Sequence, residues 1–463
     1  MSPRRVDPAD EAPPSAPLVP GSLHRVRIGG RDDHGRGLAK VHGRALRVRN
    51  ALPGETVDVK LVHIGRHVAV GRIETVVEAA ADRVEDACEH GRVCPGCGLR
   101  TSSPENRRAF VRNRVVAAFA AAGITDAPVE ETVAAPAEDG WRHKAFLTAR
   151  RTRRGIFLGL FEEQTHHLLS VEGCLAHAPA VESTLKGIRL ALERVDPSIY
   201  DERSGQGWLR TVAVRASSLS GETLVTLVAT ARSSDAERAL SEEIRLRSNR
   251  VAGVVLNVHP DKGNAPFGSR FVPLGGLTAL DEQSGAWPLR VSAGSFFQVN
   301  PVVAALLHDA VRVAAATAPP GPALDLYGGV GATSIRLEAD GRTVTLVEAP
   351  GSAAEDAAAN VARHCPGKVE VIAGRVEETW PQLAALRPSV VVANPPRSGL
   401  PPAVREGIAA LSPAVIISVA CDPAPLAKDA IAWAAKGYRL ESVTPFELMP
   451  QTPHVEAVAV FRR

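Results

Sequence analysis

The stretch ALDLYGGVGATSIRL (residues 323–337) reads as a short apolar strand, a glycine-rich turn and the start of a helix. The glycines of such a turn allow the backbone to approach a ligand above the strand end. Further apolar runs follow, each with a helix-like stretch behind it: TVTLVEA, VEVIAG, SVVVANPP and AVIISVACDP. This alternation predicts an α/β domain over 291–463, with a Rossmann-like, doubly wound parallel sheet.

A carboxylate follows the second strand of this domain. Glu348 lies twenty residues beyond Gly328, where an acidic side chain can accept hydrogen bonds from both hydroxyls of a ribose. The turn lacks the Gly-Lys-Ser/Thr ending of a phosphate-binding loop, so a nucleoside without a pyrophosphate fits better. We therefore expect S-adenosylmethionine; the alternative is that Glu348 only caps a helix.

The chain upstream divides into three parts. Residues 1–21 are Pro-rich, mix both charges and predict a disordered tail without an export signal. Residues 22–80 contain short strand-like runs separated by turns and predict an OB-like β-barrel. With its Gly35-x-Gly37 and Pro53-Gly54-Glu55 turns, this segment resembles an RNA-binding TRAM domain. Residues 81–290 mix strands and helices and predict a central α+β domain.

Four motifs stand where a ligand above the sheet could meet them. They are Ser295-Phe-Phe-Gln-Val-Asn-Pro301, Asn394-Pro-Pro-Arg397, Val419-Ala-Cys-Asp-Pro423 and Met449-Pro-Gln-Thr-Pro-His-Val-Glu456. In combination they resemble the uridine-C5 RNA methyltransferases, whose bacterial members act on transfer RNA and on 23S ribosomal RNA. The resemblance covers the chain from the TRAM-like barrel to its last residue.

The resemblance assigns chemical roles. It implies that Cys421 adds to carbon 6 of uracil as a nucleophile and that Glu456 removes the proton from carbon 5. It places the methyl donor among Gln298, Tyr327, Glu348 and Asn394, with Arg397 and His454 in support. An inert buried thiol is the alternative for Cys421, and that is our interpretation of Cys365.

This chain departs from the family pattern at three positions. Asn394 stands where the family usually has Asp, Gly328 where it usually has Cys, and Asp422 where it usually has Asn. The change at position 394 replaces a charged acceptor by an amide that also donates hydrogen bonds. We therefore expect Asn394→Asp to preserve or raise turnover.

Four cysteines suggest a metal site. Cys88, Cys94 and Cys97 lie within ten residues, and Cys174 stands far downstream. Disulfides are uncommon in cytosolic proteins, and close cysteine spacing suits zinc or an iron–sulfur cluster. The resemblance favours a [4Fe-4S] cluster with a structural or RNA-docking role.

Basic segments indicate where RNA could bind. Residues 21–75 carry eleven Lys/Arg against five Asp/Glu, and residues 141–154 carry six basic residues and no acid. The basic residues of the second segment are Arg142, Lys144, Arg150, Arg151, Arg153 and Arg154. A target uridine would be extruded from structured RNA into the pocket. Of Phe296 and Phe297, we expect at least one to lie in the core.

Other expectations come from composition and family analogy. The sequence contains no apolar run long enough to cross a membrane, so we expect a cytoplasmic monomer without membrane or DNA partners. Family analogy slightly favours ribosomal over transfer RNA. Three other hypotheses are an amino-group methyltransferase of the Asn-Pro-Pro type, an RNA-binding protein without catalysis, and an enzyme acting on a small molecule. Arg397 stands where the first of these would need an aromatic residue.

Overall fold

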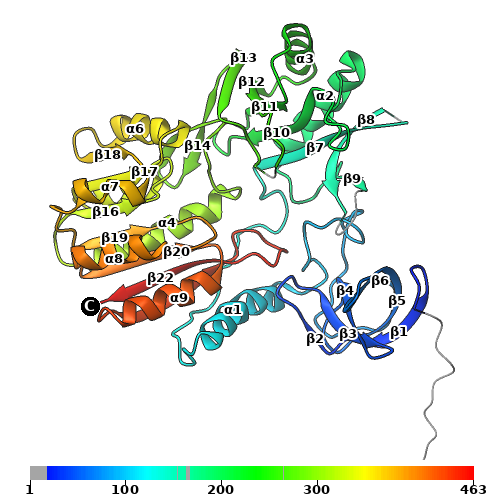
Figure 1. The fold of residues 1–463 in the computed structure, drawn as a ribbon, viewed down its shortest axis with the longest axis horizontal. Coiled ribbons are helices and arrows are strands. Elements are labelled where there is room, and N and C mark those ends of the chain that lie inside the picture. Colours follow the sequence, from blue (N-terminus) through cyan, green and yellow to red (C-terminus); the bar gives the residue numbers. More distant parts are fainter. Residues whose placement is uncertain (1–17, 154, 163–166, 264) are drawn as a thin grey trace, which may run out of the picture. The chain divides into compact units, whose positions relative to one another are not determined.

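The computed structural model describes residues 18–153, 155–162, 167–263 and 265–463 (Figure 1). These form two compact units, one of residues 1–107 with 451–453 and one of residues 108–450 with 454–463. Most of the tail predicted at 1–21 lies outside the described residues. Each unit is described by itself below.

The first unit contains a curled sheet, drawn in blue in Figure 1. Its strands are β1 (Leu23–Arg27), β2 (Gly30–Arg31), β3 (Gly37–Val41), β4 (Arg44–Arg49), β5 (Thr56–Ile64) and β6 (Val68–Glu78). Their order is β1-β5-β6-β4-β3-β2, with β4 and β6 parallel and the other neighbours antiparallel. Alternate residues such as Leu46, Val48, Val57 and Val59 are buried, and these alternating side chains form the core of a small barrel-like domain.

The central part of the second unit is a seven-stranded sheet of order β13-β12-β11-β10-β7-β8-β9. The strands are β7 (Lys144–Thr152), β8 (Gly155–Phe161), β9 (Leu168–Ser170), β10 (Leu209–Ala216), β11 (Thr223–Ala229), β12 (Val251–Val258) and β13 (Arg270–Gly276). Helices α2 (Pro179–Val195) and α3 (Ser234–Arg247) pack on it, and a hairpin of β14 (Ala279–Ser284) and β15 (Trp287–Ser292) follows. Helix α1 (Pro104–Ala121) contains the boundary between the units.

The C-terminal part has the predicted α/β architecture. After α4 (Pro301–Ala316) the elements are β16 (Ala323–Leu326), α5 (Ala332–Ala339), β17 (Val344–Glu348), α6 (Ser352–His364), β18 (Val369–Ala373), α7 (Val376–Leu383), β19 (Val390–Ala393), α8 (Pro402–Leu411), β20 (Val415–Ala420), α9 (Pro423–Ala434), β21 (Arg439–Phe446) and β22 (Glu456–Arg462). The sheet order is β18-β17-β16-β19-β20-β22-β21. Apolar side chains on both faces of the sheet form two core clusters.

The last strand departs from the expected all-parallel sheet. β16 to β20 are parallel, whereas β22 enters between β20 and β21 and runs antiparallel to both. Its reversed direction places its first residue at the edge of the sheet where β20 ends. The sequence alone did not reveal this reversal, because a buried apolar strand reads the same in either direction.

Candidate active site

The strand order changes direction at β16, and this is where the glycine turn begins. β16 pairs with β17 on one side and with β19 on the other, which is the position at which doubly wound sheets bind ligands. Gly329 and Gly331 have φ angles of 58° and 89°, in the left-handed region that favours glycine. At Gly328 an added Cβ would lie 2.6 Å from Cγ of Leu346. A side chain at position 328 would therefore press against Leu346, and the packing here suits the glycine that replaces the family's usual cysteine.

Two carboxylates lie beneath this turn. Glu348, at the end of β17, accepts a hydrogen bond of 2.9 Å from the Gly329 backbone N–H, and burial raises its pKa. Asp325 is buried in β16 and accepts a hydrogen bond of 2.7 Å from Ser334 Oγ. Burial and the nearby Glu348 raise the pKa of Asp325 to about 7, although Ser334 opposes this shift. The sequence assigned no role to Asp325, yet an acid inside the apolar strand ALDL is a signal in itself.

Tyr327 and Asn394 follow the two adjacent strands β16 and β19. The backbone N–H of Asn394 donates to the Leu326 carbonyl at 3.2 Å, so both residues lie at the same strand edge. Tyr327 has a φ of 59°, and its hydroxyl donates to Glu377 Oε1 at 3.3 Å. Its pKa is raised by burial and by the charge of Glu377. Both predicted donor-site residues thus stand beside the glycine turn.

The register of two strands brings Cys421 and Glu456 together. Ala420, the last residue of β20, pairs with Ala457 of the antiparallel β22. The next residues outward are Cys421, directly after β20, and Glu456, the first residue of β22, and side chains at such adjoining positions are close neighbours. The Glu456 charge accordingly helps to raise the pKa of the Cys421 thiol, so the two predicted catalytic groups interact electrostatically.

Glu456 is a buried acid with two stabilising partners. Its exposed fraction is 5%, and burial raises its pKa to about 7. A hydrogen bond from the Gln298 side chain and the positive charge of Arg397 oppose this rise. Gln298, which the resemblance placed at the methyl donor, therefore contacts the predicted base. A carboxyl group with this pKa can exchange a proton near neutral pH.

Cys421 lies between the end of β20 and the start of α9, and its side chain is half-buried. Burial is the main cause of its raised pKa, and Arg397 lowers the pKa in opposition. The thiol lines a small cavity together with Pro396 and Arg397 of the Pro-Pro-Arg turn. Asp422 caps α9, accepting a hydrogen bond of 3.0 Å from the Ala424 N–H. Asp and Asn are equally good at this position, which explains why the family's Asn can be replaced here.

The loop that carries Gln298 is fixed at several points. Asn300 caps α4, and its Nδ2 donates to the Leu448 carbonyl at 3.0 Å. The His143 backbone N–H donates to the Val299 carbonyl at 2.7 Å. Phe297 is buried in the core, as predicted for at least one of the two, whereas 69% of Phe296 is exposed.

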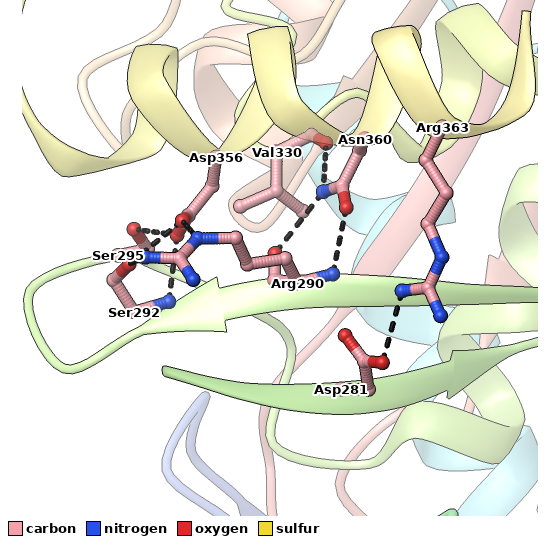
Figure 2. A network of polar contacts seen from close by, with 8 residues as sticks. All are labelled: Asp281, Arg290, Ser292, Ser295, Val330, Asp356, Asn360 and Arg363. Carbon is pink, nitrogen blue, oxygen red and sulfur yellow. Dashed lines mark hydrogen bonds and ion pairs between the residues drawn. The ribbon is translucent and has the colours of Figure 1, made fainter. Parts of the chain in front are cut away.

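A buried carboxylate on α6 anchors the start of the same loop. Figure 2 shows Asp356 facing β15 and Ser295. Its oxygens accept hydrogen bonds from the Ser292 N–H (2.6 Å), Ser292 Oγ (2.7 Å), Ser295 Oγ (2.6 Å) and Arg290 Nε (2.9 Å). One turn further along α6, Asn360 donates to the Val330 carbonyl of the glycine turn at 2.9 Å. Helix α6 thus joins the Gln298 loop to the glycine turn, a link that no sequence motif indicated.

The cysteines of the predicted cluster are divided between the two units. Cys88, Cys94 and Cys97 belong to the first unit, whereas Cys174 belongs to the second. Cys88 lies within electrostatic reach of Cys94, and burial raises the Cys88 pKa. Within the described ranges, no group of three or more His, Cys, Asp or Glu side chains is arranged to hold a metal ion.

The basic run at 142–154 is not one uniform exposed face. Lys144 is half-buried, and desolvation together with the nearby Arg215 lowers its pKa to about 7. The Arg142 guanidinium lies 4.9 Å from the Trp141 ring centroid, and Arg151 donates to Asp196 at 2.6 Å. Arg154 lies outside the described residues.

No helix in the described part of the chain is both long and apolar enough to span a membrane.

Comparisons with known proteins agree with this architecture. Residues 17–73 match the TRAM domain family. An uncharacterized RNA methyltransferase of Gloeobacter violaceus is 30% identical over 455 residues, which cover 96% of this chain and 99% of the relative. A second uncharacterized RNA methyltransferase, of Clostridium acetobutylicum, is 27% identical over 452 residues, or 96% and 98% of the two chains.

A solved structure shows the same fold. It is the tRNA (uracil-54, C5)-methyltransferase of Pyrococcus abyssi in complex with S-adenosyl-L-homocysteine, with a TM-score of 0.75 and 22% identity. The match covers 94% of this chain and 99% of that one. Together these findings confirm the family resemblance that the motifs indicated. The chain belongs to the family of RNA methyltransferases, and its own N-terminal part carries a TRAM domain.

Proposed function

We propose that this protein methylates carbon 5 of a uridine in structured RNA, with Cys421 as the covalent nucleophile and Glu456 as the base. The observation that carries the proposal is the pairing of β20 with β22, which sets a thiol beside a carboxyl group whose pKa is about 7. An amino-group methyltransferase would have no use for this pair.

The reaction balances with these two side chains. The Cys421 thiolate adds to carbon 6 of uracil, and the electron pair of the C5–C6 double bond moves into the enolate. Carbon 5 then attacks the sulfonium methyl, and S-adenosylhomocysteine leaves. Glu456 removes the proton from carbon 5, the double bond re-forms, and the thiolate is released.

Arg397 supports both charged groups. Its positive charge stabilises the Cys421 thiolate and the Glu456 carboxylate, and so opposes the effect of burial on each pKa. The N-terminus of α9, directly after Cys421, adds a positive dipole end that also favours the thiolate. We assign to His454 a supporting role in the same motif.

The methyl donor would bind above the glycine turn. We propose that Glu348 accepts hydrogen bonds from its ribose hydroxyls and that Tyr327, Asn394 and Gln298 line the rest of the site. When the donor binds, the Glu348 carboxylate would accept hydrogen bonds from the ribose hydroxyls and from the Gly329 N–H together, since its two oxygens can accept several hydrogen bonds.

The RNA substrate is part of the proposal as well. We propose that residues 22–80 and the basic strand β7 bind RNA, that residues 81–290 form a central domain, and that residues 291–463 perform catalysis. Family analogy slightly favours 23S ribosomal RNA over transfer RNA, although the Pyrococcus abyssi protein of similar fold acts on a tRNA uracil.

We further propose a cytoplasmic monomer in which Cys88, Cys94, Cys97 and Cys174 hold a [4Fe-4S] cluster, with zinc as the alternative. The cluster would supply structural stabilisation or RNA docking, and no catalytic step depends on it.

RNA containing 5-fluorouridine tests the covalent mechanism. Fluorine at carbon 5 cannot leave as a proton does, so the adduct between Cys421 and the base should accumulate and be found by mass spectrometry on the Cys421 peptide. Cys421→Ala should form no adduct. Methyl transfer from labelled donor to adenosine, unchanged in Cys421→Ala, would identify an amino-group enzyme instead. RNA binding without any methyl transfer would identify a non-catalytic binder.

A further inference from the structure

The central sheet of the second unit carries a pocket whose lining includes neither Cys421 nor Glu456. It has a volume of about 610 Å³ and is lined by β7, β8, β10, β11 and the segment after β12 (elements labelled in Figure 1). This volume is within the range of pockets that bind small ligands. Its lining includes Arg150, Phe161, Tyr200, Arg210 and His259.

Aromatic rings and guanidinium groups are paired in this pocket. Cζ of Arg210 lies 4.7 Å from the Tyr200 ring centroid, and Cζ of Arg150 lies 5.9 Å from that of Phe161. Phe161 is 37% exposed, so a large apolar ring remains accessible beside a cation. Flat rings next to guanidinium groups are the surface on which proteins stack nucleobases.

The Arg210 guanidinium is held in place from behind. Its Nη1 donates to the His259 carbonyl at 2.9 Å and to the Asp261 carbonyl at 2.7 Å. Two neutral acceptors orient the group without cancelling its charge, so the cation stays available to an anion.

The charge balance of the pocket favours an anionic ligand. Four arginines line it, at positions 150, 151, 203 and 210, against the two carboxylates Asp201 and Glu202, and one of them, Arg151, is already paired with Asp196. Asp201 already accepts hydrogen bonds from the backbone N–H groups of Arg203 (3.0 Å) and Ser204 (2.8 Å). A ligand that combines a planar ring with a negative charge matches this arrangement.

We propose that this pocket binds an unpaired nucleotide of the substrate RNA other than the one presented to Cys421. The base would stack on Tyr200 or Phe161, and Arg150 and Arg210 would neutralise its phosphate. The inference rests on the RNA substrate of the proposed function and names a second contact that contributes to affinity. It assigns these residues no part in the chemical step.

Substitutions of the two rings test the pocket. The probes are 23S ribosomal RNA and total tRNA purified from cells that lack this gene. For whichever RNA the wild type binds, Kd should rise about tenfold or more in the double variant Phe161→Leu/Tyr200→Leu. Tyr200→Phe, which keeps the ring, should bind like the wild type. The kcat at saturating RNA should be unchanged, because these residues do not contact the reacting atoms. Leu219→Ala is the matched control, since it removes an exposed apolar side chain elsewhere in the same domain.

Ultraviolet cross-linking supplies an independent readout. Nucleotide adducts should appear on the peptides that contain Phe161 or Tyr200. Wild-type affinity in the double variant, with cross-links confined to other peptides, would overturn the inference. A rise in Kd with an unaltered melting temperature would support the pocket as an RNA contact. If the methyl group is then found on a base other than uridine, the proposed uridine chemistry fails and the inference about the pocket stands.

Discussion

Two buried carboxylates of the C-terminal α/β part have the same raised pKa, about 7, and different surroundings. Asp325 lies in the middle of the sheet, where Ser334 and Glu348, which act on its pKa, belong to the adjoining helix and strand of the α/β fold. Glu456 lies at the strand edge, where its partners Gln298 and Arg397 come from separate motif loops. A perturbed pKa therefore does not by itself identify a catalytic group. Our proposal for Glu456 rests on its position beside Cys421.

The largest effect should come from the nucleophile. Cys421→Ala removes the only group proposed to activate carbon 5, so kcat should fall about 10⁴-fold or more in a labelled methyl-transfer assay. Cys365→Ala is the matched control, because this buried cysteine packs in the core and should leave kcat unchanged. Equal losses in both variants would point to a general folding defect instead of a catalytic role.

Exchanging the two acids for amides separates their roles. Glu456→Gln should lower kcat by about 10² to 10⁴-fold, because proton removal loses its base, while the adduct with RNA still forms. The matched variant Asp325→Asn leaves Glu456 in place, so it should change mainly the KM for S-adenosylmethionine. In wild type, kcat should rise with pH through about 7 as Glu456 loses its proton. A Glu456→Gln enzyme with the wild-type kcat would contradict the assigned role.

The anchor on α6 should have an intermediate effect. Asp356→Ala leaves the Ser292, Ser295 and Arg290 donors without their acceptor, which should lower the free energy of unfolding by about 3 kcal/mol. Displacement of the Gln298 loop should also lower kcat about tenfold. Arg363→Ala, which breaks the half-exposed Asp281–Arg363 pair in the same region, should cost less than about 1 kcal/mol and leave kcat intact. Denaturant unfolding and steady-state rates measure both effects.

Stability should depend on pH through Asp325. Its folded-state pKa of about 7 lies above that of an unfolded aspartate, about 4, so the folded protein binds this proton more tightly. The resulting stabilisation is complete at low pH and is lost as the pH rises through 7. Between about pH 5 and pH 8, the melting temperature of Asp325→Asn should therefore fall less than that of the wild type. The difference should be roughly 2–4 °C for each kcal/mol of pH-dependent stability that the substitution removes. An identical fall of the melting temperature in wild type and variant would show that the proton responsible is not bound at Asp325.

The smallest effect should come from the donor side. Asn394→Asp restores the acceptor that the family usually carries and should preserve kcat or raise it by less than about tenfold. Asn394→Ala, which removes the amide, is the control. A large loss in Asn394→Asp would show that the amide donates a hydrogen bond of its own.

The sequence predicted much of this architecture because its signals are local. The glycine turn, the alternating strands and the TRAM-like barrel all follow from short patterns, and the structure and the comparisons confirm them. The proximity of Cys421 and Glu456 is different, because it depends on the antiparallel insertion of β22, a feature of sheet order that no window of sequence contains.

Other features of the site could not be predicted from the sequence for a similar reason. Asp356 and Asn360 look like ordinary helical polar residues, and only the packing of β15 on α6 makes them an anchor (Figure 2). The contact of Gln298 with Glu456 joins residues 158 positions apart. The four cysteines stay a prediction: three of them belong to one compact unit and Cys174 belongs to the other.

The antiparallel ladder between β20 and β22 also limits how the enzyme can change. Successive side chains of a strand point to opposite faces, so deleting one residue within 457–462 would turn Glu456 to the other face if the remaining pairs kept their register. Insertions before Glu456 carry no such penalty, since they lengthen a connection and leave the ladder intact. Backbone hydrogen bonds between β20 and β22 thus fix the separation of the thiol and the carboxylate, and the loop before Glu456 can vary in length without changing it.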